Sequence, residues 1–122
     1  MKALVVDDSR TMRMILSKML RELGFGVVGA ADGRAALSVL DGDSAPDLML
    51  VDWNMPVMTG IEFIEAVRSA PYNSTARIVM VTTETEVPSV VAALEAGADE
   101  YVMKPFTKDA IFEKLQLLGF EI

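Results

Sequence analysis

The chain has 122 residues, of which 52% are hydrophobic and 24% charged, and its formal net charge is -7. It contains neither cysteine nor histidine, which excludes disulfide scaffolds, thiolate metal sites and histidine-based catalysis on this chain. The acidic balance argues against nucleic acid or anionic membranes as partners and favours cations. The length predicts one domain, residues 1–122, with its own core.

Short apolar runs alternate along the chain with helical patterns. A run at 3–6 predicts a strand, and the apolar stripe from Met12 to Leu23 predicts a helix ending before Gly24. Next come a weaker strand at 26–31 and a short helix at 35–40, then a strand at 48–51 and a helix at 61–67. The last two pairs are a strand at 78–81 with a helix at 87–94, and a strand at 101–103 with a helix at 111–118. Five such units in series predict an α/β fold, a parallel sheet with helices on both faces.

Polar residues stand at the carboxyl ends of four of these runs: Asp7 with Asp8, then Asp52, Thr82 and Lys104. The carboxyl ends of parallel strands share one edge of the sheet, and open α/β sheets bind ligands there, where the strand order reverses. If the first and third strands are neighbours at that point, they lie about 4.8 Å apart. The carboxylates of Asp7, Asp8 and Asp52 then converge.

Three crowded carboxylates repel one another unless a cation or a proton intervenes. A site of oxygen ligands alone favours a hard ion, and a few carboxylates completed by waters suit Mg²⁺ better than Ca²⁺. A hydrated Mg²⁺ beside a carboxylate, with a lysine and a hydroxyl opposite, is an arrangement for phosphoryl transfer. In it the carboxylate is the nucleophile.

With these residues the sequence resembles the receiver domains of two-component response regulators, and among them the single-domain chemotaxis regulators of the CheY type. The resemblance runs from about residue 3 to about residue 118. Residues 52–60, DWNMPVMTG, fit the family pattern D-x-x-M-P-x-M-x-G, and the paired acids, Thr82 and Lys104-Pro105 complete the set in the family's order. The resemblance implies a flavodoxin-like, doubly wound sheet of five parallel strands in the order 2-1-3-4-5, with five helices on both faces.

The resemblance also implies which residues hold the metal and accept the phosphoryl group. Asp52 is the expected phosphoacceptor. Asp7, Asp8 and Asp52 are the expected Mg²⁺ ligands, together with the backbone carbonyl of Asn54. The peptide bond between Lys104 and the proline that follows it is cis in the family.

Other matching positions imply residues that form a conformational switch and residues that set the lifetime of the phosphoryl group. Thr82 and Lys104 are expected to contact phosphoryl oxygens, and Thr82 and Tyr101 to form the switch. Asn54 and Glu84 are expected to tune how fast water removes the phosphoryl group. One residue departs from the family: Thr83 stands where alanine or glycine is usual, which is expected to narrow access to the phosphoacceptor.

The resemblance implies a signalling protein rather than an enzyme, with only slow self-phosphorylation from small donors and slow self-dephosphorylation. The expected donor is a sensor histidine kinase or a phosphotransfer protein. The expected partner of the phosphorylated form is a downstream target protein, such as a flagellar motor switch. It is expected to bind the surface of the fourth helix, fifth strand and fifth helix. We expect a cytoplasmic protein, because the sequence has no cysteine and no visible signal peptide or membrane-length apolar stretch. We also expect a monomer.

Alternatives remain at this point. Within the family, the chain is either a stand-alone regulator, a phosphorelay intermediate or a receiver from a longer regulator. Outside it, an aspartyl-phosphate phosphohydrolase of the haloacid-dehalogenase type has a second aspartate where Asn54 stands. A flavodoxin-like FMN binder needs a hydroxyl- and glycine-rich loop after the first strand, where this chain has two acids.

Each site residue also has a simpler interpretation. Asp7 and Asp8 suit the cap of the first helix, Asp52 suits a turn, and Lys104 suits a solvated surface. Taken singly these interpretations are common, and it is the combination at successive strand ends that favours a functional site.

Overall fold

The computed structural model describes residues 1–42, 45–53, 55–83 and 87–122, with residues 87–89 described by their backbone alone. Strands and helices alternate along the described chain as the sequence predicts. They are β1 (Lys2–Val6), α1 (Arg10–Glu22), β2 (Gly26–Ala30), α2 (Gly33–Leu40), β3 (Leu48–Asp52), α3 (Gly60–Arg68), β4 (Arg77–Thr82), α4 (Val87–Ala96), β5 (Glu100–Met103) and α5 (Lys108–Leu117).

All strand pairs of the sheet are parallel, and their order is β2-β1-β3-β4-β5. The predicted doubly wound fold is therefore confirmed. In the register Val6 lies beside Val51, so β1 and β3 are neighbours where the strand order reverses. The residues that follow these two strands consequently emerge side by side at the carboxyl edge of the sheet.

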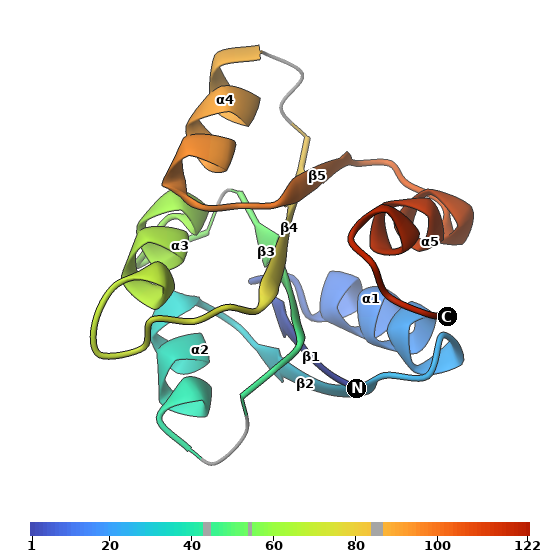
Figure 1. Ribbon diagram of the computed structural model, residues 1–122, viewed down its shortest axis with the longest axis horizontal. Coiled ribbons are helices and arrows are strands. Elements are labelled where there is room, and N and C mark those ends of the chain that lie inside the picture. Colours follow the sequence, from blue (N-terminus) through green and yellow to red (C-terminus); the bar gives the residue numbers. More distant parts are fainter. Residues whose placement is uncertain (43–44, 54, 84–86) are drawn as a thin grey trace.

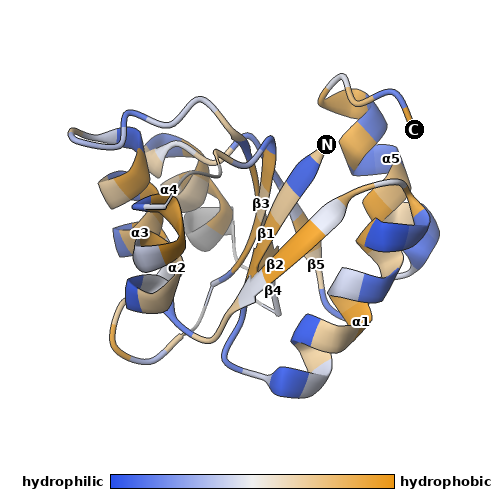
Figure 2. Ribbon diagram, turned by 90° about the horizontal axis from the view of Figure 1, so that it is seen from below, coloured by the Kyte–Doolittle hydropathy of each residue, from blue (hydrophilic) through white to orange (hydrophobic). Residues whose placement is uncertain are grey.

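The sheet lies between two layers of helices (Figure 1). Helices α2, α3 and α4 cover one face, and α1 and α5 cover the other. Figure 2 shows the apolar strands between these layers, with hydrophilic stretches mainly on the outer sides of the helices. Within the described residues, no helix is long and apolar enough to cross a membrane.

Successive side chains of each central strand point to opposite faces, and both faces are covered. On β1, Leu4 and Val6 pack in the layer of α2–α4, where Phe63 is completely buried. Ala3 and Val5 pack in the other layer against residues such as Leu16. Because both faces are buried, these strands need apolar residues at every position, which is why their sequences show no alternation.

Helices α1, α2, α3 and α5 begin at side-chain caps. Ser9, Asp32, Thr59 and Thr107 each accept a hydrogen bond from a backbone N–H in the first turn that follows. Such bonds satisfy amide donors that have no partner inside the helix. Thr107 is the cap of α5. The helix α1 is capped by Ser9 rather than by either of the two acids before it.

Candidate functional site

The first pair of acids follows β1 directly. Asp7 is 1% exposed, whereas Asp8 is exposed to solvent. The backbone N–H of Ser9 donates to Asp7 Oδ1 at 2.8 Å, and the Ser9 hydroxyl oxygen accepts from the N–H of Met12 at 3.2 Å. The same turn therefore caps α1 and orients the buried carboxylate.

Asp52 ends β3 and is 7% exposed. The backbone turns sharply after it: Trp53 donates to the carbonyl of Val81 at 3.0 Å, and Gly60 donates to the carbonyl of Trp53 at 3.2 Å. A Cβ at position 60 would lie 2.6 Å from the Asp52 carbonyl oxygen. Gly60, the last residue of the motif 52–60, is thus required because the start of α3 packs closely against the backbone of Asp52.

The carboxylates of Asp7, Asp8 and Asp52 form one group, in which one oxygen of each lies within 4.8 Å of the others. The Lys104 ammonium lies 3.3 Å from Asp52 Oδ1 and 3.4 Å from Asp7 Oδ2. Lys104 reaches this point because it follows β5, where its backbone N–H donates to the Thr82 carbonyl at 2.7 Å. The peptide bond between Lys104 and its proline is cis, as the family resemblance implies.

This group of oxygens fits Mg²⁺. Three carboxylates are available, no nitrogen or sulfur ligand stands among them, and Lys104 offsets only part of their charge. Hard divalent cations bind such oxygen sets, and Mg²⁺ does so with few protein ligands and several waters. The chemistry of the donors therefore supports a divalent cation at the carboxyl edge of the sheet.

Burial raises the pKa of Asp52, and the charge of Asp7 raises it further, while Lys104 acts in the opposite direction. A carboxyl whose pKa is higher in the folded than in the unfolded protein binds protons more tightly when folded. Its contribution to stability is therefore present below the unfolded value, near 3.8, and is lost as the pH rises through the folded value.

We accordingly expect Asp52→Asn to stabilise the Mg²⁺-free protein, by about 1 kcal/mol at neutral pH, because it removes a poorly solvated charge. The difference from wild type should grow as the pH rises above 3.8. Urea unfolding in EDTA at several pH values measures it. A difference that stays constant with pH would contradict this account.

The two residues predicted to form the switch, Thr82 and Tyr101, lie on the neighbouring strands β4 and β5. Thr82 ends β4, is 3% exposed and follows Val81, the register partner of Asp52. Thr83, the departure from the family, is exposed. Tyr101 lies on β5, half-buried against the layer of α2–α4, with the Lys114 ammonium 4.8 Å from its ring centroid.

The structure thus brings together most of the predicted site. Asp7, Asp8, Asp52 and Lys104 form one cluster, and Thr82 ends the strand between those of Asp52 and Lys104. The predictions for Asn54 and Glu84 lie outside the described residues. Sequence reasoning missed Arg13, whose guanidinium donates to the Asp7 carbonyl at 2.7 Å. No motif marks this residue, because its partner is a backbone atom.

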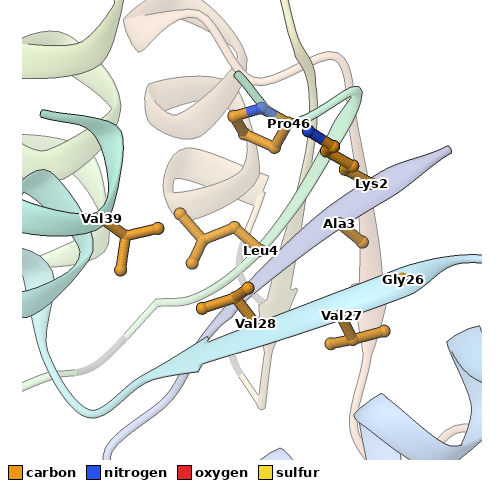
Figure 3. A pocket seen from close by; sticks show the side chains of 8 residues that line it. All are labelled: Lys2, Ala3, Leu4, Gly26, Val27, Val28, Val39 and Pro46. Atoms are coloured by element: carbon orange, nitrogen blue, oxygen red, sulfur yellow. The ribbon is translucent and has the colours of Figure 1, made fainter. Parts of the chain in front are cut away.

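An apolar pocket of about 310 Å³ lies at a different place, beside the start of β1 and β2 (Figure 3). The side chains of Leu4, Val28 and Val39 face one another there, and among the lining residues that the structure describes Lys2 is the only charged one. The described lining of this pocket contains no carboxylate, so it lacks the charged oxygen ligands that favour a hard divalent cation. The acidic cluster is therefore the better candidate for the functional site.

Comparisons with known proteins agree with this geometry. The family profile of the response regulator receiver domain matches residues 3–116. The chain is 41% identical over 119 residues to the chemotaxis protein CheY1 of Helicobacter pylori, which covers 97% of this chain and 96% of that protein. It is 42% identical over 117 residues to the chemotaxis protein CheY of Pseudomonas aeruginosa, covering 95% and 94%.

Solved structures give the same result. The chemotaxis response regulator CheY4 of Vibrio cholerae superposes with a TM-score of 0.88 at 38% identity, covering 96% of this chain and 97% of that one. The chain belongs to the response regulator receiver domain family, and within it to the CheY type. It is a phosphoacceptor domain of two-component signalling.

Proposed function

We propose that Asp52 is the phosphoacceptor and that the reaction requires Mg²⁺. The observation that carries this proposal is the cluster itself. A buried carboxylate at the end of β3 has two further carboxylates within 4.8 Å and the Lys104 ammonium at 3.3 Å. A nucleophile, a place for a cation and a fixed positive charge are the parts that phosphoryl transfer needs.

The Mg²⁺ ligands in this proposal are Asp7, Asp8 and Asp52, with the backbone carbonyl of Asn54 as the family resemblance implies. Bound there, the ion supplies positive charge to the oxygens of the transferring phosphoryl group. A carboxylate oxygen of Asp52 attacks the phosphorus atom, its bond to phosphorus forms, and the bond to the leaving group of the donor breaks. Lys104 stands within reach of the developing charge.

The donor in this proposal is a sensor histidine kinase or a phosphotransfer protein. The chain itself is then a signalling protein with no turnover of a substrate beyond slow self-phosphorylation from small donors and slow self-dephosphorylation. Asn54 and Glu84 set the lifetime of the phosphoryl group. We propose that the protein acts in the cytoplasm and as a monomer.

Phosphorylation acts through Thr82 and Tyr101 in this proposal. A phosphoryl group on Asp52 adds charge and strong acceptors, which favour the arrangement in which Thr82 is drawn toward it. Tyr101 then changes position on β5 and alters the surface of α4, β5 and α5. A downstream target reads that surface, and the CheY relatives favour a chemotaxis role with a flagellar motor switch as target.

The test is intact mass spectrometry after incubation with acetyl phosphate, with and without Mg²⁺, on wild type and on Asp52→Asn. We expect one phosphoryl adduct on wild type with Mg²⁺, and none without Mg²⁺ or on the variant. If Thr83 excludes this small donor, a histidine kinase replaces it in the same experiment. An adduct that persists on Asp52→Asn would overturn the assignment of the phosphoacceptor.

A further inference from the structure

Arg13 connects α1 to the end of β1. It lies in the second turn of α1, and its Nη1 donates to the carbonyl oxygen of Asp7 at 2.7 Å. This distance is typical of a strong hydrogen bond from a charged donor. The carbonyl belongs to the peptide group that joins Asp7 to Asp8, so the guanidinium is bound to the link between two predicted Mg²⁺ ligands.

All four polar groups of Asp7 are held in different directions. Its N–H donates to the Ala30 carbonyl at 3.1 Å, and its Oδ1 accepts from the Ser9 N–H at 2.8 Å. Its Oδ2 lies 3.4 Å from Lys104 Nζ, and its carbonyl accepts from Arg13. Ser9 and Lys104 bind the carboxylate itself, whereas Arg13 fixes the backbone and leaves the carboxylate oxygens to other partners.

The peptide group between Asp7 and Asp8 is planar, so holding its carbonyl also orients its N–H and restricts the tilt of the whole group. The hydrogen bond from Arg13 therefore restrains the backbone unit from which both residues extend. Metal sites depend on such bonds to residues behind the ligands, because a ligand that must be ordered on binding loses affinity.

The neighbouring strand leaves room for the arginine. A Cβ at Gly29 on β2 would lie 3.5 Å from Arg13 Cδ, so the arginine stem passes directly over this glycine. Arg10 and Arg21 line the same surface groove as Arg13 and Gly29. Among the described residues, neither of these two arginines is hydrogen-bonded to Asp7, so they share the charge of Arg13 but not its contact.

On these grounds we infer that Arg13 is a positioning residue for the Mg²⁺ site, acting through the peptide group between Asp7 and Asp8. This inference rests on the proposed function, because it presupposes that the two carboxylates bind Mg²⁺. It adds a residue outside the acidic cluster whose effect is on metal affinity. Once the metal is bound, the chemistry at Asp52 proceeds as before.

The test compares Arg13→Met with Arg10→Met, which removes the same charge from the same groove. Mg²⁺ affinity is measured by calorimetry and by the fluorescence of Trp53, and the phosphorylation rate with acetyl phosphate is measured across Mg²⁺ concentrations. For Arg13→Met we expect Mg²⁺ affinity to fall about 10-fold. The half-saturating Mg²⁺ concentration for phosphorylation should rise by the same factor, with the rate at saturation retained. For Arg10→Met we expect a change of less than about 2-fold.

A second variant disturbs the same contact without changing Arg13, so that misfolding of Arg13→Met alone cannot explain the result. Gly29→Val adds a branched side chain, suited to a strand, against the arginine stem, and it keeps Arg13 in the sequence. We expect the same direction of change in Mg²⁺ affinity, with thermal unfolding in EDTA confirming that both variants are folded.

The outcomes separate this inference from the proposed function. Equal Mg²⁺ affinities of wild type and Arg13→Met, or equal losses in Arg13→Met and Arg10→Met, would overturn the role of Arg13. A fall in the saturated rate with unchanged affinity would overturn it as well. A wild-type protein that binds no Mg²⁺ would contradict the proposed function itself, and the inference with it.

Discussion

Arg68→Met is expected to lower the free energy of unfolding by about 3 kcal/mol, the largest stability loss that we predict from a single side chain. Arg68 ends α3 and binds three backbone carbonyls that no helix or strand satisfies in its place. It donates to Ser74 at 2.9 Å, to Ala76 at 2.7 Å, and twice to Gly97, at 3.0 and 2.9 Å. Methionine keeps most of the stem volume but leaves these acceptors without a donor.

The same guanidinium is paired with a carboxylate. Arg68 Nη2 lies 2.9 Å from Asp99 Oδ2, and that oxygen also accepts from the N–H of Ile78 at 2.8 Å. Arg68 therefore ties the end of α3 to the start of β4 and to the loop before β5. Removing it loosens both connections at once, which is why the predicted loss exceeds that of an ordinary ion pair.

Arg77→Met is the matched control. Arg77 Nη1 lies 3.4 Å from Asp99 Oδ1, and its side chain is 53% exposed. An exposed pair of this kind contributes less than about 1 kcal/mol, so we expect a small loss. Urea unfolding monitored by circular dichroism measures both variants. Equal losses would show that the carbonyl bonds of Arg68 contribute little.

The sequence predicts strands well in this protein because the central strands are buried on both faces. Runs such as 48–51 have no polar residue. So short and wholly apolar a run is typical of a strand that is buried on both faces. Helix starts are less accurate. The apolar stripe of α1 is first visible at Met12, but the helix begins at Arg10, because Ser9 provides the cap and the first turn faces solvent.

The acidic cluster could be predicted because two facts suffice: the acids follow strands, and parallel strands end at one edge. Its finer geometry could not be predicted. The contact between Lys104 and both Asp7 and Asp52 depends on where a long flexible side chain settles. Bonds from Arg13 and Arg68 to backbone carbonyls leave no pattern in the sequence at all, since every residue carries a carbonyl.

Lys104→Met is expected to slow phosphorylation of Asp52 on the order of 100-fold at saturating Mg²⁺. The Lys104 side chain is 19% exposed and its ammonium lies 3.3 Å from Asp52 Oδ1, so it is already in place where charge develops on the transferring group. A preorganised charge in a partly buried site contributes far more than the same charge in water. Methionine keeps the length of the side chain and removes the donor.

The same substitution should change Mg²⁺ binding in the opposite direction, and this contrast identifies the role of the lysine. Lys104 now lies against one oxygen of Asp7 and one of Asp52, and it competes with a cation for both. Without it the three carboxylates repel one another more strongly, so Mg²⁺ should bind more tightly while the reaction becomes slower. Rates from intact mass and affinities from calorimetry measure the two effects, with Lys108→Met as control, since Lys108 pairs with Glu22 away from the cluster. A slower reaction accompanied by weaker Mg²⁺ binding would mean that Lys104 supports the metal site and does not act on the phosphoryl group.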